Sequence, residues 1–394
     1  MSEEVDKPDQ QSKQVNPKGT NPKRMEHAQS SAQVDDVNGG RRPLEVPYRD
    51  ISGLLYPEEG RRQNLRGFRE DYVDIVHYIV KSTHDVWEGG AVGLIYTHYT
   101  HDARVHTSGG MLYGRDKVVE NTLERQAGFP NARAYADDVI WSGDEENGFH
   151  TSHRVLNIAR NTGYSPYGPP TGRWIRRYGV AHCLVLENKI VEEWIVHDNL
   201  AVVRGLGLDP HAWAKELAQR DADAGFRPTE TFGDTGHRRG QEPPPVGTTE
   251  EGDLEPEALL RSSVHEIWNW RMFDQIDRYY APNLVLYTTG NRILHGRGDY
   301  RYNVVALLAA FPDALVLVDH ICSLPNGEHG YRVATRWTLI GTHTGYGWYG
   351  PPSGKRVRIT GVTHSELQND QIVREWLLYD EVELLRQIQN PTLA

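Results

Sequence analysis

The sequence has little cysteine, no long apolar run and no excess of basic residues. Its 394 residues include only two cysteines, Cys183 and Cys322, so we expect buried thiols in a reducing compartment, the cytoplasm, rather than a disulfide framework. No apolar run reaches about 18 residues, and the first residues lack the apolar core of a secretory signal, so we expect no membrane contact. The net charge of −11 argues against a nucleic-acid partner, which requires a basic surface.

Motifs for binding metals and phosphates are also missing. Neither a His-Glu-x-x-His motif nor a close pair of cysteines occurs, and His98, His101 and His106 are not repeated elsewhere in the chain. The Gly-Pro-Pro-x-Gly segment at 168–172 contains prolines and leads toward a predicted strand, whereas a phosphate-binding loop leads into a helix. The sequence therefore predicts no metal site and no cofactor.

The sequence does contain a long internal repeat. Residues 154–204 align with residues 336–386 without a gap, at an offset of 182 residues, and 20 of the 51 aligned pairs are identical. The identical pairs are concentrated in motifs such as 167–170 with 349–352. A period of this length indicates a duplicated domain rather than a solenoid of short units. Polar residues that are present in both copies are therefore candidates for function.

Composition and periodicity divide the chain into four parts. Residues 1–45 are polar and are expected to form a disordered tail. Residues 67–207 and 254–390 are the two predicted domains, and 208–253 hold a short helix from Asp209-Pro210 followed by a flexible linker. In each domain, helical periodicity comes first (68–87 in the first copy) and long strands follow. This order predicts an α+β fold.

The repeated motifs resemble, in their order, those of the SnoaL-like polyketide cyclase family, within the nuclear transport factor 2-like fold. The motifs are Gly341–Gly345, Gly350–Lys355, Ile372–Trp376 and Asp380 in the second copy, and Thr162-Gly163, Gly168–Arg173, Ile190–Trp194 and Asp198 in the first. The resemblance implies two tandem cone-shaped, curved antiparallel sheets, each wrapped on N-terminal helices as in a cystatin-like α+β barrel. It also implies a pocket inside the cone and an aldol-type cyclase that uses an acidic residue and no cofactor.

Asp198 and Asp380 are the first candidates for chemistry, because the resemblance places the catalytic carboxylate there. Strand alternation puts each aspartate on the same face as Trp194 or Trp376. In an apolar interior, desolvation would raise the carboxyl pKa toward a value suited to removing a proton beside a carbonyl. The alternative is that each aspartate caps the turn at the end of its strand.

His182 and His364 are the second pair of candidates. A histidine near such an aspartate would relay its proton or hold an enolate oxygen, whereas the alternative is a structural histidine bonded within the sheet. Four arginines are expected either to bind a substrate carboxylate or enolate, or to form ion pairs with Glu193 and Glu375. These arginines are Arg154, Arg336, Arg176 and Arg358.

Aromatic residues complete the predicted site. Tyr164 and Tyr346 lie in loops and are expected either to offer a hydroxyl to the ligand or to pack over the following prolines. Trp194 and Trp376 are expected to form the pocket wall or the core. His343 is a substrate-binding candidate of the second copy alone, since Asn161 occupies its place in the first.

The sequence thus predicts a cofactor-independent acid/base enzyme, an aldol-type cyclase, lyase or isomerase, that acts on a small hydrophobic carbonyl compound. Two alternatives stay open, namely a non-catalytic module that binds a small molecule, and a hydrolase or dehydratase that uses the same pocket. We expect the two domains to pair as an intramolecular pseudo-dimer, because the linker raises their effective concentration. Further homo-oligomerisation is left open.

Overall fold

The computed structural model describes residues 52–57, 60, 62–226, 255–328 and 330–392. The predicted disordered tail, 1–45, and the part of the predicted linker from 227 onward lie outside the described residues. The described residues form one compact unit, and both copies of the repeat lie within it. None of the described helices is long and apolar enough to cross a membrane.

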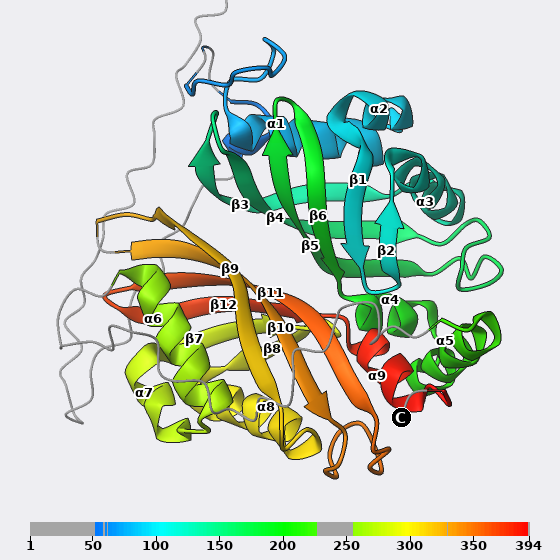
Figure 1. Ribbon diagram of the computed structural model, residues 1–394, viewed down its shortest axis with the longest axis vertical. Coiled ribbons are helices and arrows are strands. Elements are labelled where there is room, and N and C mark those ends of the chain that lie inside the picture. Colours follow the sequence, from blue (N-terminus) through cyan, green and yellow to red (C-terminus); the bar gives the residue numbers. More distant parts are fainter. Residues whose placement is uncertain (1–51, 58–59, 61, 227–254, 329, 393–394) are drawn as a thin grey trace, which may run out of the picture. The chain divides into compact units, whose positions relative to one another are not determined.

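The first copy begins with short helices and continues as strands (Figure 1). Its elements are η1 (Ser52–Leu54), α1 (Ile75–Thr83), η2 (His84–Glu88), η3 (Val92–Leu94), α2 (Ile95–His98), β1 (Tyr99–Thr107), β2 (Gly110–Tyr113), α3 (Arg115–Gly128), β3 (Arg133–Asp144), β4 (Gly148–Arg160), β5 (Trp174–Leu186), β6 (Lys189–His197) and α4 (Asn199–Leu206). Helix α5 (Pro210–Ala224) follows as predicted, capped by the Asp209 carboxylate, which accepts a hydrogen bond from the Ala212 N–H.

The second copy repeats this order of elements. Its elements are α6 (Pro256–Ser263), η5 (Val264–Asn269), η6 (Phe273–Gln275), α7 (Ile276–Tyr279), β7 (Tyr280–Thr288), β8 (Arg292–His295), α8 (Gly296–Ala310), β9 (Leu315–Pro325), β10 (Gly330–Thr342), β11 (Arg356–Gln368), β12 (Gln371–Tyr379) and α9 (Glu381–Gln389). The predicted α+β class is confirmed in both copies.

Each copy forms a six-stranded sheet, ordered β2-β1-β6-β5-β4-β3 in the first and β8-β7-β12-β11-β10-β9 in the second. The prediction of wholly antiparallel sheets is wrong, because β1 pairs with β6, and β7 with β12, in parallel. The reason is the path of the chain. In each copy a helix, α3 or α8, carries the chain to the far edge of the sheet, and three hairpin connections then bring the last strand beside the first strand in the same direction. The sheets are not closed into barrels, since two edge strands remain in each.

Two local features differ from the periodicity of the sequence. Helix α1 begins only at Ile75, where the Asp74 carboxylate accepts a hydrogen bond from the His77 N–H at 2.7 Å. Phe68 and Tyr72 precede the helix yet remain buried. Helices α4 and α9, which directly follow the last strand of each copy, were not predicted, and they determine the surroundings of both candidate aspartates.

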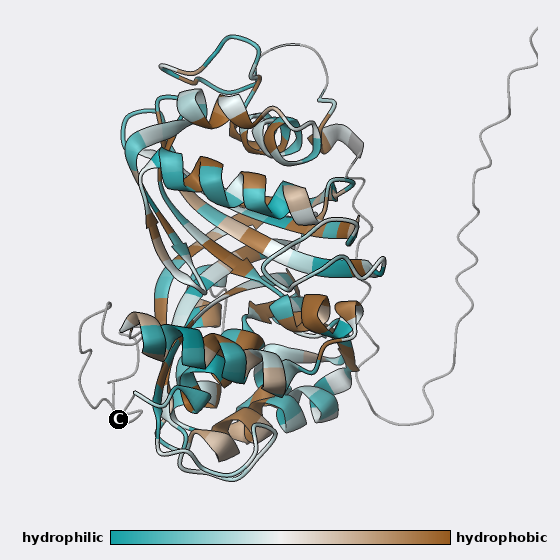
Figure 2. Cartoon of the chain, turned by 90° about the vertical axis from the view of Figure 1, so that its right-hand side faces the viewer, coloured by the Kyte–Doolittle hydropathy of each residue, from teal (hydrophilic) through white to brown (hydrophobic). Residues whose placement is uncertain are grey.

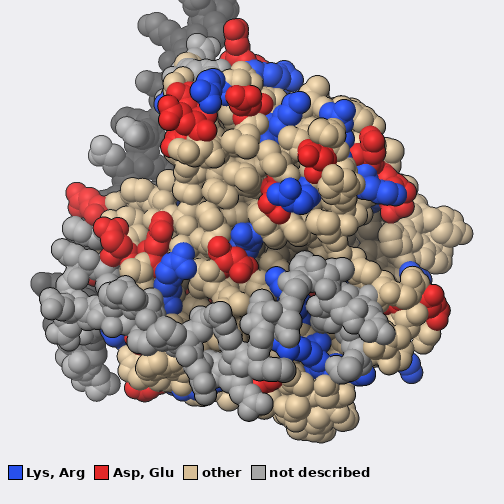
Figure 3. All heavy atoms as spheres, viewed as in Figure 1, with Lys and Arg blue, Asp and Glu red and all other residues tan. Residues whose placement is uncertain are grey.

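The interior of each copy lies between its sheet and its helices, which carry hydrophobic and hydrophilic residues on different faces (Figure 2). In the first copy the buried cluster includes Tyr78, Phe149 and Val185. In the second it includes Trp268 and Trp337. On the face shown in Figure 3, acidic and basic side chains are interspersed.

The two copies contact each other through their sheets. Val180 and Val196 of the first copy form one buried cluster with their equivalents in the second, Val362 and Leu378. Since these side chains alternate with those that face the helices, each sheet has one face toward its own cone interior and one face toward the other copy.

Candidate functional site

Asp198 is buried at the end of β6, where it caps α4. Its carboxylate accepts hydrogen bonds from the backbone N–H groups of Ala201 at 3.1 Å, Gly290 at 2.8 Å and Asn291 at 3.1 Å. Burial raises the pKa of Asp198, and these three donors oppose the shift because they stabilise the ionised form. Gly290 and Asn291 belong to the second copy, so this carboxylate also joins the two copies.

Asp380 has the same position in the second copy, where it caps α9. It accepts hydrogen bonds from the N–H groups of Val382 and Glu383 and, at 2.6 Å, from the side-chain amide of Asn199. Burial raises the pKa of Asp380, against the effect of its donors. Both aspartates thus make the capping contacts that were the structural alternative for them, and a catalytic role for either stays a prediction.

Trp194 and Trp376 lie on the sheet faces between the copies, which corrects the expectation that they face the cone interior. The Arg336 guanidinium lies over the Trp194 ring at 3.4 Å from its centroid, and Arg154 lies over Trp376 at 3.5 Å. The two contacts are equivalent and reciprocal, each joining one copy to the other. Pairing of the sheets explains this, because the face that alternation assigned to a pocket is covered by the second copy.

Glu193 and Glu375, one residue before each tryptophan, occupy the opposite face and lie among the buried residues of the two interiors. Both carboxyls are only 2% exposed. Burial raises the pKa of each to about 7, because desolvation penalises the ionised form. Sequence reasoning named them only as ion-pair partners for arginine, although their presence in both copies and their place in the alternation were visible signals.

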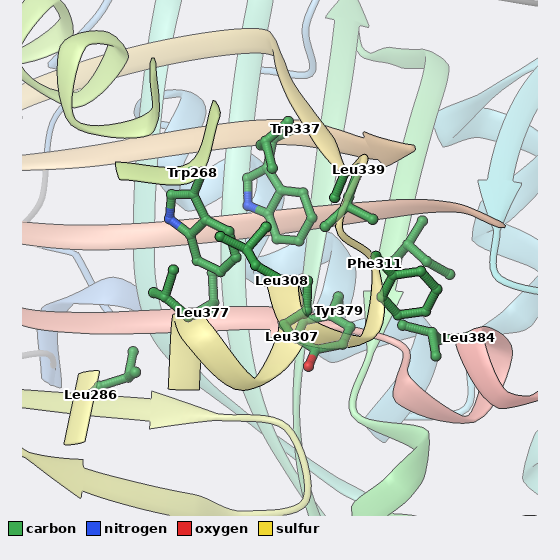
Figure 4. Packing of buried hydrophobic residues seen from close by; sticks show 14 of the residues in the cluster. Trp268, Leu286, Leu307, Leu308, Phe311, Trp337, Leu339, Leu377, Tyr379 and Leu384 are labelled. Atoms are coloured by element: carbon green, nitrogen blue, oxygen red, sulfur yellow. The ribbon is translucent and has the colours of Figure 1, made fainter. Parts of the chain in front are cut away.

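Glu375 borders a small apolar cavity inside the second copy, with a volume of about 30 Å³. Figure 4 shows Trp268, Trp337, Leu377 and Tyr379 of this interior turned toward one another from helix and sheet. The remaining lining residues are Leu260, Ser263, Val264, Tyr280, Tyr300, Leu307, Val316, Thr335, Leu339 and Thr363. This cavity has the composition of a site for a small apolar molecule with few polar groups.

A chain of hydroxyl groups leads to the Glu375 carboxyl. The hydroxyls of Tyr280 and Tyr300 are 2.5 Å apart, and Tyr280 donates to Glu375 Oε2 at 3.4 Å. Trp268 Nε1 donates to the Tyr300 oxygen at 3.3 Å, and Ser365 donates to Glu375 at 3.1 Å. Because an ionised carboxylate only accepts hydrogen bonds and an indole N–H only donates them, each group in the chain donates toward the Glu375 carboxylate.

The first copy has a reduced version of this arrangement. Tyr99 donates to Glu193 at 2.8 Å, and the Cys183 thiol donates to it at 3.6 Å in the place of Ser365. Val118 occupies the position equivalent to Tyr300, within the packed core. The second phenol is therefore specific to the second copy.

His182 and His364 are both buried at the contact between the copies. His364 Nε2 lies 2.8 Å from the Ser152 hydroxyl, and His182 packs edge-on against Trp194. Burial lowers the pKa of His364 to about 4 and that of His182 well below its ordinary value. Within the described part of the chain, neither histidine bonds Asp198 or Asp380, so the expected relay does not form.

The predicted arginines do not share one site. Arg154 donates to Asp137 at 2.7 Å and not to Glu193 or Glu375, the expected partners. Arg176 is exposed and donates to Asn291 at 3.2 Å. Arg336 and Arg358 instead border a cavity described below.

The predicted loop residues do not converge on a pocket. The Tyr164 and Tyr346 side chains are 75% and 77% exposed. His343 is buried, with Nδ1 at 3.1 Å from the Ser353 hydroxyl in the same loop. The structure gives His343 the position of a loop-stabilising residue, and its role in substrate binding stays a prediction.

A larger cavity, with a volume of about 270 Å³, lies between the copies. Four predicted site residues border it, namely Trp194, Arg336, Arg358 and Asp380. Glu383 also lines it, and burial raises the pKa of this carboxyl to about 8. Tertiary structure thus brings together candidates from both copies, at a place that no single copy contains.

Comparison with protein families confirms the resemblance for the second copy. Residues 258–388 match the model of the SnoaL-like polyketide cyclase family. That segment is therefore a SnoaL-like domain, and the first copy has the same strand order and the same sequence of elements. No curated protein sequence matches the chain.

Solved structures similar to this chain each cover about a third of it. IdmH of Streptomyces antibioticus, described as a candidate polyketide cyclase, is 21% identical over 33% of this chain and 96% of its own, with a TM-score of 0.29. AclR of Streptomyces galilaeus, described as a candidate hydroxylase, is 25% identical over 34% and 85%, with a TM-score of 0.30. A candidate SnoaL-like polyketide cyclase of Jannaschia sp. is 19% identical over 36% and 99%, with a TM-score of 0.31.

Proposed function

We propose that the second copy is an acid/base catalyst that moves a proton beside the carbonyl group of a small hydrophobic compound. The reaction classes are those of an aldol-type cyclase, a lyase or an isomerase. The observation that carries the proposal is the Glu375 carboxyl, buried at the wall of an apolar cavity with a pKa of about 7. A general base with a pKa near the working pH is ionised in a large fraction of the molecules and is still basic enough to take a proton from carbon.

The neighbouring groups have complementary roles. Ionised Glu375 accepts the proton from carbon, and its protonated form returns a proton at a later step. In the resting state the hydroxyls of Tyr280 and Tyr300 donate toward ionised Glu375. Once Glu375 has taken the proton and lost its charge, these hydroxyls are the donors for the developing enolate oxygen. The apolar wall excludes water, which strengthens these interactions.

The second copy is favoured over the first for two reasons. It holds the second phenol, Tyr300, and it is the segment that matches the cyclase family model. Its cavity of about 30 Å³ has room for about one water molecule. Substrate binding therefore requires the apolar wall to move. In this proposal Asp198 and Asp380 act as helix caps and not as the catalytic base.

The test uses a probe that reports proton removal alone. Wild-type protein in D₂O should accelerate deuterium incorporation into the methyl group of acetophenone, followed by NMR. Glu375→Gln, which keeps the size of the side chain, should lower the enzyme-catalysed rate by about 10²–10⁴-fold.

Glu193→Gln is the matched control, because Glu193 has the same burial and the same pKa direction in the first copy. It should keep most of the rate. Equal losses in both variants would contradict the assignment to the second copy, and exchange no faster than in buffer would contradict proton abstraction from such ketones. Products formed from a wider panel of carbonyl compounds would separate the cyclase, hydrolase and dehydratase alternatives.

A second candidate function is binding of a small carboxylate in the 270 Å³ cavity between the copies. It is favoured by Arg336, whose Nε is buried and has no hydrogen-bond partner among the described residues. Calorimetric titration with benzoate should show binding that Arg336→Met weakens at least tenfold and Glu375→Gln leaves unchanged. Such binding without any exchange activity would favour the binding module.

A further inference from the structure

Three histidines from both copies converge between the sheets. His150 lies on β4, His182 on β5 and His320 on β9, and one nitrogen of each lies within 4.8 Å of the other two. The rings of His150 and His320 have their centroids 4.2 Å apart, and those of His182 and His320 4.8 Å. A search of the sequence for closely spaced ligand motifs could not find this cluster, because its members come from separate strands and from both copies.

The repeat provides an internal comparison for this cluster. At the offset of 182 residues, the equivalents of His150, His182 and His320 are Arg332, His364 and Asp138. There Arg332 forms a salt bridge with Asp138, and His364 Nδ1 lies 3.9 Å from the same carboxylate, so a cation and an anion face the histidine. The histidine cluster thus has neither the cation nor the anion of its counterpart.

His182 also lacks the hydroxyl that its counterpart uses. His364 Nε2 bonds Ser152, whereas the position equivalent to Ser152 in the second copy is Ala334. Both ring nitrogens of His182, a fully buried residue, have no hydrogen-bond partner in the described structure. Nδ1 of His150 and of His320 is likewise buried and unpartnered there. A buried nitrogen without a partner costs free energy, and here four of them lie on three rings that meet at one place, so the cluster offers lone pairs to a ligand.

We propose that His150, His182 and His320 bind one divalent transition-metal ion, zinc before others, between the two copies. Neutral imidazoles are the ligands that Zn²⁺, Cu²⁺ and Ni²⁺ share, and three histidines with one open position form a known zinc ligand set. Zinc–nitrogen bonds of about 2.0–2.1 Å place ligand nitrogens roughly 3.4 Å apart. The nitrogens lie within 4.8 Å of one another, so binding of the ion requires the rings to rotate toward a common centre.

The local charges are compatible with this ligand set. Burial lowers the pKa of all three histidines, to about 4 for His320, so their lone pairs are available at neutral pH. Arg336 opposes a dication because it is close enough to lower the same three pKa values. Its charge is partly offset by Asp319 and by the Trp194 ring on which it lies.

The ion would join the copies, because its ligands come from both. Its role is therefore distinct from that of Glu375, which lies inside one cone. Metal binding should raise the melting temperature of the whole chain, since the ligand set exists only when both copies are folded and paired.

The test is metal uptake by full-length, untagged protein that has been stripped with EDTA and incubated with Zn²⁺ alone. Elemental analysis should find one zinc per chain, and Tm should rise with the zinc concentration. The double substitution His150→Arg with His320→Asp rebuilds the ion pair of the equivalent position, so it should fold without metal. It should bind zinc at least 100-fold more weakly and lose the dependence of Tm on zinc.

Two further variants make the result decisive. His320→Asn removes one ligand from a half-buried position and should also weaken zinc binding by at least 100-fold. It provides the test if the double variant does not fold. His101→Ala, at a side chain 83% exposed, should bind zinc as the wild type does. Absence of zinc, Co²⁺ and Ni²⁺ uptake by the stripped wild type, or equal uptake by His320→Asn, would overturn the proposal.

Discussion

At the scale of single residues, Glu375 couples the proposed chemistry to stability. Its carboxyl has a pKa of about 7 in the folded chain against 4.5 when exposed. Between these values the folded state holds more protons than the unfolded state, so stability falls as pH rises. The loss of stability caused by burying Glu375 is complete above pH 7 and absent below about pH 4.5. A general base in an apolar site therefore lowers the stability of the protein at neutral pH.

Glu375→Gln should remove this penalty. Relative to the variant, the wild type should lose about 3 kcal/mol of unfolding free energy between pH 4.5 and pH 8, at 1.36 kcal/mol per pKa unit. Urea denaturation of both proteins across this range measures the difference, in which the effects of Glu193 and Glu383 cancel. A difference independent of pH would mean that Glu375 titrates normally and would remove the basis of the proposed function.

At the scale of elements, the strand-to-helix junctions explain why both copies keep an aspartate. Asp198 and Asp380 end the last strand and provide acceptors for the first N–H groups of α4 and α9. These N–H groups have no partner within the helix, so a capping carboxylate stabilises each helix. Helix capping alone is therefore sufficient to explain an aspartate at both positions.

Replacement of Asp380 should distinguish capping from catalysis. Asp380→Asn keeps a good cap and should change stability little, whereas Asp380→Ala should cost about 1–2 kcal/mol in urea unfolding at pH 7. Asp209→Ala, which removes the exposed cap of α5, should cost about 1 kcal/mol and serves as the control. A strong loss of exchange activity in Asp380→Asn at unchanged stability would restore Asp380 as a catalytic residue.

At the scale of the whole molecule, duplication has assigned different roles to equivalent positions. The reciprocal contacts of Arg154 with Trp376 and of Arg336 with Trp194 are the same in both directions. The positions around these contacts differ between the copies. Arg332 and Asp138 form an ion pair where the equivalent residues, His150 and His320, belong to the histidine cluster. One cone has a second phenol at the position where the other has a packed valine.

The shared sheet contact should make the two copies unfold together. Wild type should show one calorimetric transition, and Val362→Asp should separate it into two, because a charge buried between the sheets weakens the contact. Val305→Asp, at a 39% exposed position on α8, is the control and should leave one transition. Two transitions in the wild type would show that the copies are energetically independent.

Sequence patterns alone were enough to predict the duplication, the α+β class and the positions of most strands. These depend on local patterns, since alternation, helical periodicity and turn residues act within a few positions of the chain. The sequence also identified the polar residues shared by the copies, including Glu193 and Glu375, although it assigned these two only to ion pairs. Alternation separated Trp376 from Glu375 onto opposite faces without showing which face was interior.

Which face of each sheet is enclosed became clear from the packing of the two copies. Pairing of the sheets covers the tryptophan face with the other copy, so the glutamate face becomes the cone interior. The same pairing brings together His150, His182 and His320, and the cavity that contains Arg336 and Asp380. Such sites depend on contacts between residues far apart in the chain, which are set by packing and not by any local pattern of sequence.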